Sequence, residues 1–364
     1  MNKTIVGFGE IMGRIEAEGF LRIRQAMPGP IQIGFYGAEA NVLVSLQMLG
    51  RTTRYVTALP DTSLGDACID AVRRFGVDTS HILRTKDRLG LYFVETGANQ
   101  RSSNVIYDRA YSAISKAAPS SYHWDAIFAD ARWFHVTGIT PALSENAAEA
   151  TLASVLAAKD RNIPVSCDLN FRKKLWDWDS SCTPKKLAER TMRKILPYID
   201  VLIGNEEDAD DVLGIKAGST DVSKGELAID RYPDVAAQII SQFPNIKKVA
   251  FTLRESISAS HNNWGAMLYD GSSSKAFFHP MRDGAYKPYE IRNIVDRIGG
   301  GDAFGAGLVF ALTDEEMKEK PEHIIGFATA ASCLAHSIKG DFNYVTKSEV
   351  LSLMGGDASG RVKR

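Results

Sequence analysis

The sequence predicts a doubly wound α/β fold, in which a mostly parallel sheet is flanked by helices. From about residue 124 onward, short apolar runs rich in β-branched residues alternate with longer runs of helical periodicity. Such alternation is typical of a parallel sheet with helices on both faces. The chain has 364 residues and a hydrophobic content of 45%, enough to fill a sizeable core. Because no long linker, low-complexity segment or internal repeat interrupts it, we expect a single domain over residues 1–364.

The regular part of the chain divides into strands and helices by hydrophobic period. Strands are expected near residues 132–137, 163–168, 198–203 and 246–252. Helices are expected near residues 144–158, 183–196, 234–243, 302–313 and 321–337. Before these, the same reasoning predicts a strand from Thr4 to Glu10, a helix from Gly37 to Leu49, a strand over 53–59 and a helix over 65–75.

Two segments, about 11–36 and 88–112, do not fit the alternation of strand and helix. The first alternates charged and apolar positions around Pro28-Gly29-Pro30, and the second holds the short strand patterns 91–95 and 104–107. We expect the two segments to form a small β-strand lid over the ends of the main strands, where ligands bind in open α/β sheets. Residues 355–364 are polar and basic, and we expect a frayed tail.

Composition excludes several classes of function. A formal net charge of -1 argues against a nucleic-acid footprint. The N-terminus has no signal-peptide core and no apolar run approaches membrane-spanning length, so we expect neither secretion nor a membrane partner. Four widely spaced cysteines without a CxxC pair predict reduced thiols in a cytoplasmic protein. The sequence contains no HExxH motif, so nothing in it suggests a zinc site.

One stretch carries most of the chemistry: Asp296-Arg-Ile-Gly-Gly-Gly-Asp302-Ala-Phe-Gly-Ala-Gly307. It follows a β-branched run at 291–295, interpreted as a strand, and precedes an apolar helical run. The three glycines bring bare amides close to a ligand, and a helix starting at Asp302 adds positive potential, which suits phosphate. An acid there would repel the anion, but it makes sense if it takes a proton from an attacking hydroxyl. The alternative is a glycine-rich turn with Asp302 as an ordinary N-cap.

A dinucleotide-binding fold is disfavoured by the first strand. Gly7, Gly9 and Gly13 form GxGxxxG, one residue longer than the dinucleotide fingerprint, because Met12 occupies the place of the third glycine. The simpler interpretation is that these glycines end the strand.

Taken together, the motifs resemble the ribokinase and phosphofructokinase-B carbohydrate kinase family. The family signature is close to DTxGAGD, which Asp296 to Asp302 matches with Arg297 and Gly300 as departures. A second signature, a glycine pair, an asparagine and a helix ending in Leu-Gly, is matched by Tyr36 to Asn41 and on to Gly50, with Tyr36 replacing one glycine. Gly76-Val-Asp-Thr79 also fits the family pattern, and the matches run from Glu10 to about Gly340.

Within that family the chain is most similar to 2-keto-3-deoxygluconate kinases. The matching runs are Gly90-Leu-Tyr92, Tyr107-Asp-Arg109 followed by Ser112-Ala113, and Asp168-Leu-Asn-Phe-Arg172 followed by Leu175-Trp176. The usual family run is Tyr-Tyr-Arg, so Asp108 is a departure. The resemblance implies an ATP-dependent kinase that phosphorylates the C6 hydroxyl of the sugar acid, as well as a homodimer in which two lids pack together.

The resemblance also implies roles for individual residues. Asp302 is expected to be the general base, with Gly299, Gly300 and Gly301 forming an anion hole. Arg109 and Arg172 are expected to bind the substrate carboxylate. The remaining substrate contacts are expected from Gly34, Gly37, Asn41, Tyr92 and Tyr107.

For the nucleotide side, the family pattern NxxE falls on Asn205 to Asp208, with the acid one methylene shorter. Asp208 is expected near the phosphates and Mg²⁺, with any metal contact through water, although an acidic first helical turn would explain it equally well. The family's Thr-Leu-Gly is Thr252-Leu-Arg254 here, before a polar insert, Ser256 to Asn263. Thr252 and Arg254 are expected to bind the nucleotide, and the alternative for Arg254 is a solvated surface charge. Thr329 and Ser332 are expected to line the adenine pocket. The sequence leaves open whether a monovalent cation such as K⁺ is used near Asp296.

Two further functions compete with the sugar-acid kinase. A family kinase for a neutral sugar, such as fructose or ribose, would leave Arg109 and Arg172 without a carboxylate to bind. A non-catalytic sugar sensor on the same fold is disfavoured by the intact Asp302 and its glycines. The sequence does not distinguish the gluconate from the galactonate series.

Overall fold

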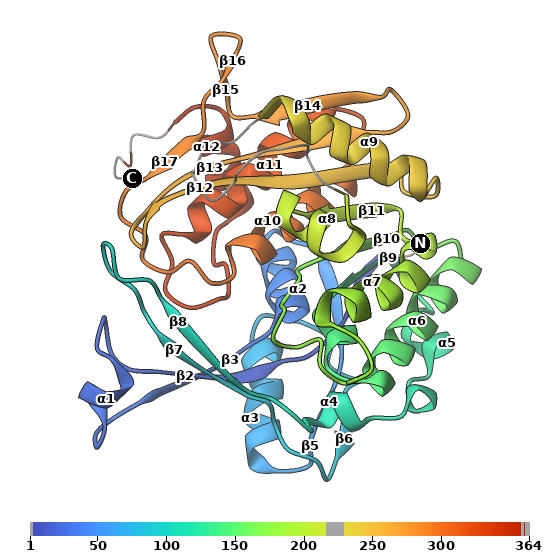
Figure 1. Cartoon of the computed structure of the whole chain (residues 1–364), viewed down its shortest axis with the longest axis vertical. Coiled ribbons are helices and arrows are strands. Elements are labelled where there is room, and N and C mark those ends of the chain that lie inside the picture. The colour runs from blue at the N-terminus through green and yellow to red at the C-terminus, as the bar shows by residue number, and fades with distance from the viewer. Residues whose placement is uncertain (1–2, 216–228, 358–359, 361–364) are drawn as a thin grey trace.

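The computed structural model describes residues 3–215, 229–357 and 360. Within these residues, the centre of the molecule is a nine-stranded sheet (Figure 1). Its strands are, in spatial order, β14 (Lys275–His279), β13 (His261–Asp270), β12 (Lys248–Ser258), β11 (Val201–Gly204), β10 (Val165–Asp168), β9 (Ala131–Thr137), β1 (Thr4–Phe8) and β4 (Thr52–Val56), with β17 (Tyr289–Ile291) paired to β13.

The predicted fold class is confirmed, since the sheet is mostly parallel. Strands β4, β1, β9, β10, β11 and β12 all pair in parallel. Antiparallel pairing appears only at the far edge, where β13 pairs with β12, β14 and β17. The chain order of the strands reverses at β1, which lies between β4 and β9, and such a switch point is where open α/β sheets form ligand sites.

Helices cover both faces of the sheet, and each face has its own apolar core. One core takes in α6 (Glu145–Asp160), α7 (Pro184–Ile195), α8 (Glu206–Leu213) and α9 (Tyr232–Gln242). The other takes in α2 (Ala38–Met48), α3 (Ser63–Arg73), α10 (Gly300–Leu312), α11 (Pro321–Ala335) and α12 (Lys347–Met354). Side chains alternate between the two along a strand: Ile5 packs into the second core, and its neighbour Val6 into the first.

The segments 11–36 and 88–112 contribute one separate four-stranded sheet, the lid sheet. It consists of β3 (Gln32–Tyr36), β2 (Met12–Glu16), β7 (Leu91–Glu95) and β8 (Asn104–Asp108), in that order. In Figure 1 the lid sheet extends away from the main body, with the short helix α1 (Ile23–Ala26) at its far end. That helical turn was not expected from the strand-like pattern of the first segment.

The C-terminal half differs from the sequence prediction at two places. The predicted polar insert, residues 256–263, is ordered as the tip of a β-hairpin: it ends β12, turns and begins β13, and Ser256 pairs with Asn262. The strand expected over 291–295 ends earlier, because β17 stops at Ile291. Val295 then donates its amide to the carbonyl of His336 instead of to a neighbouring strand.

The remaining elements are small. They are β5 (Ala58–Pro60) with β6 (Leu83–Thr85), β15 (Met281–Arg282) with β16 (Ala285–Tyr286), and the short helices α4 (Ala113–Lys116) and α5 (Trp124–Ile127). Among the described residues, none of the helices combines the length and apolarity needed to cross a bilayer. Most of the expected frayed tail, residues 358–359 and 361–364, lies outside the described residues.

Candidate active site

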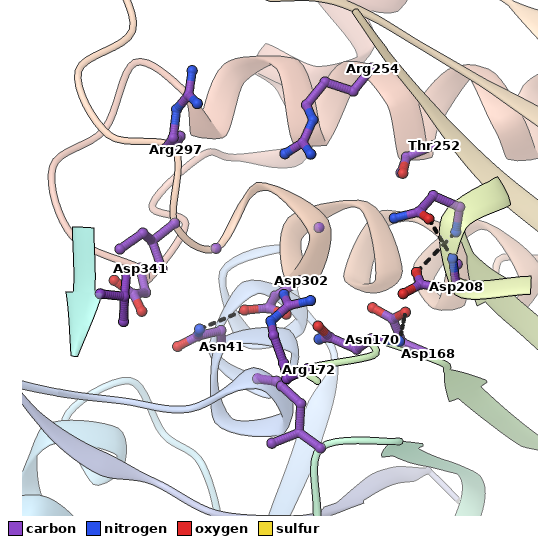
Figure 2. A pocket seen from close by; sticks show the side chains of 18 of the residues that line it. Asn41, Asp168, Asn170, Arg172, Asp208, Thr252, Arg254, Arg297, Asp302 and Asp341 are labelled. Carbon is purple, nitrogen blue, oxygen red and sulfur yellow. Dashed lines mark hydrogen bonds between the residues drawn. The ribbon is translucent and has the colours of Figure 1, made fainter. Parts of the chain in front are cut away.

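A cavity of about 690 Å³ lies between the lid sheet and the ends of the central strands. The lid contributes Met12, Tyr92 and Tyr107, and the strand ends contribute Asp168 and Gly204. Figure 2 shows Asp302 and Asn41 in the middle of this cavity, with Asp168 and Asp208 to one side and Arg254 and Arg297 on the opposite wall from Arg172. Residues that the sequence predicted for the sugar and residues that it predicted for the nucleotide therefore line one cavity.

The glycine turn places Asp302 in the first turn of α10. Gly299 is the N-cap and has φ of +86°, a left-handed conformation that favours glycine. A Cβ there would lie 2.4 Å from the carbonyl oxygen of Asp341, so a side chain does not fit. Gly299 and Gly301 line the cavity, whereas Gly300 is buried and faces the ring of His336. The amides at the start of α10 lack intrahelical partners, which suits an anion in the cavity.

Asp302 is half-buried and held by one side chain. Asn41 Nδ2 donates a hydrogen bond of 2.7 Å to its Oδ2 (Figure 2). Burial raises the pKa of Asp302 to about 7, although the hydrogen bond from Asn41 opposes this rise. A carboxyl group with a pKa near neutrality is suited to accept a proton from an alcohol.

The predicted substrate residues divide into those at the cavity and one behind it. Gly37, Asn41, Tyr92, Tyr107 and Arg109 all line the cavity. Gly34 does not, because the ring of Tyr36 covers it: a Cβ at Gly34 would lie 2.5 Å from that ring. Tyr36, the residue that departs from the family signature, itself lines the cavity and so shapes the wall where Gly34 was expected.

The two arginines proposed for the substrate carboxylate differ in their surroundings. Arg109 is buried, and its Nε donates a hydrogen bond of 2.7 Å to Glu10, whose other oxygen accepts from Ser112. Arg172 is exposed at the cavity, where it lowers the pKa of Asp168, Asp208 and Asp302. Arg109 is thus oriented by a protein carboxylate, whereas among the described residues Arg172 donates only to a backbone carbonyl, that of Phe171 at 2.9 Å.

Asp108 does not face the sugar side. It lies on the outer face of the lid and forms a two-point ion pair with Arg88, with distances of 2.7 and 2.9 Å. Its neighbours in sequence, Tyr107 and Arg109, face the cavity. The departure from the family run Tyr-Tyr-Arg therefore changes the outer surface of the lid and leaves the polarity of the cavity unchanged.

Asn205 and Asp208 form a capping box at the start of α8. Asn205 Oδ1 accepts from the amide of Asp208 at 2.8 Å, and Asp208 Oδ2 accepts from the amide of Asn205 at 3.1 Å. The second oxygen of Asp208 accepts from the amide of Phe171 at 2.9 Å. Burial nevertheless raises the pKa of Asp208 to about 6. Both residues line the cavity, so the structural and the ligand-binding interpretations are compatible.

Asp168, at the end of β10, is an acidic residue of the site to which the sequence analysis gave no role. Burial and the neighbouring Asp208 and Asp302 raise its pKa to about 8, against the opposing charge of Arg172. Its position as the last residue of a buried strand was the signal that could have identified it. Among the described residues no group of three or more His, Cys, Asp or Glu side chains is arranged to hold a metal ion. Asp168 and Asp208 supply the oxygen chemistry that Mg²⁺ prefers when phosphates complete its shell.

The nucleotide side matches the sequence prediction only in part. Thr252 and Arg254 line the cavity. Thr329 and Ser332 lie inside α11, fully buried, and their hydroxyls donate to the carbonyls of Ile325 and Gly300. The structure thus places neither at the cavity, because the face of α11 that carries them packs on α10. Trp264, His336 and Arg297 line this side of the cavity instead.

A family model described as pfkB family carbohydrate kinase matches residues 4–255, more than half of the chain. The chain therefore belongs to the pfkB family of carbohydrate kinases, as the glycine motifs predicted. It is a phosphotransferase with a hydroxyl group as acceptor, and kinases of this family use ATP with Mg²⁺.

Several relatives within the family are named as kinases of 2-dehydro-3-deoxy sugar acids. The chain is 30% identical to a 2-dehydro-3-deoxygalactonokinase of Haloferax volcanii over 98% of this chain and 99% of the relative. It is 27% identical to a 2-dehydro-3-deoxygluconokinase of Thermoproteus tenax, covering 89% of this chain and 88% of the relative. Among solved structures, a 2-dehydro-3-deoxygluconokinase of Thermotoga maritima is 39% identical with a TM-score of 0.86, covering 97% of this chain and all of that one.

Proposed function

We propose that the protein transfers the γ-phosphoryl group of ATP to the C6 hydroxyl of 2-keto-3-deoxygluconate, giving the 6-phosphate. The observation that carries this proposal is that a half-buried acid, Asp302, and two arginines, Arg109 and Arg172, line the same cavity. The acid suits a hydroxyl that must lose a proton, and the arginines suit a substrate carboxylate. The names of the relatives support the same substrate class.

In this proposal, Asp302 accepts the proton of the attacking hydroxyl as the oxygen bonds to phosphorus. The amides of Gly299 and Gly301 and the N-terminus of α10 stabilise the negative charge on the phosphoryl oxygens in flight. Asn41 holds Asp302 in place through the 2.7 Å hydrogen bond. Phosphoryl transfer depends on positioning and charge neutralisation more than on covalent help from the protein.

Mg²⁺ neutralises phosphate charge when bound. We place it near Asp168 and Asp208, because both acids line the cavity and are close enough for the charge of Asp208 to raise the pKa of Asp168. Asp208 already accepts two backbone amides, so a water-mediated contact fits it better than direct ligation. Thr252, on the strand next to Asn205, and Arg254 would bind the nucleotide phosphates.

A second candidate function is a kinase for a neutral sugar. The pairing of Arg109 with Glu10 favours it, because an arginine already matched to a carboxylate gains less from a second one. A fructokinase of potato is 26% identical over 97% of this chain. In that case Arg109 would serve to order the lid, and only Arg172 would face the sugar.

The outer face of the lid sheet supports a homodimer. Ile33, Ile15, Phe93 and Ile106 lie side by side across the four strands, and side chains at directly paired positions share one face. Ile33 and Ile106 are 59% and 50% exposed. We propose that a second copy of the chain covers this row, lid against lid, because a contiguous apolar face is rarely left in water.

The experiment is to incubate the protein with ATP, Mg²⁺ and each of 2-keto-3-deoxygluconate, its galactonate epimer, fructose and ribose. ADP release measures turnover, and phosphorus NMR locates the new phosphate ester. We expect turnover with the sugar acids and an ester at C6. Turnover confined to fructose or ribose would support the second candidate, and no turnover with any of them would reject both.

A further inference from the structure

A buried arginine joins the lid to the glycine turn. Arg14, in β2, is 1% exposed, and its Nη2 donates to Asp296 Oδ2 and to Glu16 Oε2, each at 2.7 Å. Its Nη1 donates to Asp341 Oδ1. Lys339 adds a second cation at the rim, 2.8 Å from Glu16. Three buried carboxylates therefore share one guanidinium, which is costly to desolvate and is stable only because it is paired.

The carboxylate of Asp296 has little capacity left for another cation. Its Oδ1 accepts from the amides of Arg297 and Ile298, at 2.8 and 3.2 Å. Its Oδ2 accepts from Arg14 and from the amide of Gly340, at 2.7 and 3.2 Å. Lys339 Nζ lies 3.9 Å from the same oxygen. Each oxygen thus already meets two donors.

This arrangement disfavours a monovalent cation near Asp296, which the sequence left open. A metal ion there would need oxygen ligands, and the oxygens of Asp296 are occupied by N–H groups. It would also sit beside the guanidinium of Arg14, whose like charge repels it. The residues present therefore do not fit a K⁺ site at this carboxylate.

The same guanidinium fixes both walls of the anion-binding turn. Asp296 begins the turn that runs to Gly301, and its Oδ1 holds the first two amides of that turn. Asp341 is the other wall: its backbone packs against Gly299, and its Oδ2 accepts from Tyr92 of the lid at 2.7 Å. Arg14 bridges the two carboxylates, so the position of Gly299 depends on it.

We propose that Arg14 is a positioning residue that serves as the resident cation of the glycine turn, so that phosphoryl transfer requires no monovalent metal ion. The guanidinium balances Asp296 and Asp341, ties them to the lid strand β2, and thereby sets where the amides of Gly299 and Gly301 point. This inference rests on the proposed function wherever kcat is measured. The effect of K⁺ on the melting temperature tests the inference separately from the proposed function.

The first test uses the unmodified protein in KCl and in tetramethylammonium chloride at equal ionic strength, after exchange into metal-free buffer with Mg²⁺ added back. We expect kcat and the melting temperature to be the same in both salts. A saturable rise of either quantity with K⁺ would overturn the proposal, because an ion that binds the folded state raises its stability by mass action. The melting temperature reports on the site even if the assigned sugar proves wrong.

The second test replaces the cation. Arg14→Ala removes the guanidinium that bridges Asp296 and Asp341, and we expect kcat to fall by roughly 10²-fold, the cost of misplacing groups at a reacting centre. Guanidinium or methylguanidinium should restore kcat in a saturable manner, and tetramethylammonium should not. Arg51→Ala is the matched control: Arg51 is a half-buried arginine paired with Asp314 at 3.1 Å, away from the cavity, and its loss should give no rescuable defect in kcat.

Arg14→Lys covers the case in which the alanine variant does not fold. Lysine keeps the charge but offers one ammonium group instead of a fork, so it cannot bridge both carboxylates with the same geometry. We expect a folded protein with lowered kcat and an unchanged KM for the sugar. Normal kcat in either variant, or a defect in Arg14→Ala that guanidinium does not relieve, would contradict the proposal.

Discussion

Asp302 combines burial, one hydrogen bond and a helix N-terminus, and these three features predict its behaviour. Asp302→Asn keeps the shape of the side chain but removes the proton acceptor. We expect kcat to fall by about 10²–10⁴-fold, the usual contribution of a general base. Sugar binding by calorimetry and the melting temperature should remain close to those of the unmodified protein. Retention of most of the activity would remove Asp302 from the mechanism.

The raised pKa of Asp302 predicts a pH dependence. A general base must be unprotonated, so kcat/KM should rise with pH through about 7 and level off above it. Asn41→Ala removes the N–H group that stabilises the carboxylate, so the pKa of Asp302 should rise. The acidic limb of the profile, the pH range over which kcat/KM rises, should then move to higher pH. A hydrogen bond to a charged group is worth about 1.5–3 kcal/mol, which corresponds to a displacement of roughly one pH unit or more.

The control for this profile is Asn245→Ala. Asn245 also donates side-chain hydrogen bonds, to the carbonyls of Leu196 and Ile199, but it does not line the cavity. Its loss should leave the acidic limb where it is. If Asn41→Ala leaves the limb in place as well, the titration belongs to another group, such as Asp168, whose pKa is about 8.

The two arginines predict selectivity for the carboxylate. Arg172→Ala should weaken binding of the sugar acid by roughly 1.5–3 kcal/mol and affect neutral sugars less. Arg109→Ala alone would leave the buried Glu10 without its cation. The informative comparison is therefore between the double variant Arg109→Ala/Glu10→Gln and the single variant Glu10→Gln. Arg88→Ala, on the outer face of the lid, is the control. Equal losses for acids and neutral sugars would mean that the arginines serve the fold or the nucleotide.

At the scale of elements, hydrophobic period predicted the buried strands and the lid strands β7 and β8, and it missed the tip of the hairpin of β12 and β13. The strands β9, β10 and β11 are apolar runs covered on both faces, and the sequence placed all three. The hairpin of β12 and β13 was interpreted as a polar insert, because at its tip the chain is held by backbone pairing such as Ser256 with Asn262, which leaves no apolar pattern.

Contacts distant in sequence explain what the site analysis missed. The glycine turn and Asp302 are local features and could be read from the sequence. Arg14 meets Asp296 and Asp341 across 282 and 327 positions, and no local pattern predicts such a pairing. Thr329 and Ser332 were assigned by family position, but the packing of α11 on α10 decides that their hydroxyls face backbone carbonyls.

For the whole molecule, the lid face predicts assembly. Light scattering at micromolar concentration should give about twice the chain mass of 39.9 kDa. Ile106→Glu places a charge in the middle of the apolar row and should give a monomer, whereas Leu351→Glu, an equally drastic change at a 39% exposed leucine of α12, should not. A monomeric unmodified protein would contradict the lid-to-lid dimer.

The most direct test of the central claim compares two substrates that differ only in the carboxylate: 2-keto-3-deoxygluconate, and 3-deoxyfructose, in which a hydroxymethyl group replaces it. The ratio of their kcat/KM values isolates the contribution of that one group. If Arg109 and Arg172 bind the substrate carboxylate, kcat/KM should be at least about tenfold higher for the acid than for 3-deoxyfructose, as expected for a charged hydrogen bond. Equal kcat/KM values, or a preference for 3-deoxyfructose, would contradict the account and identify the protein's substrate as a neutral sugar.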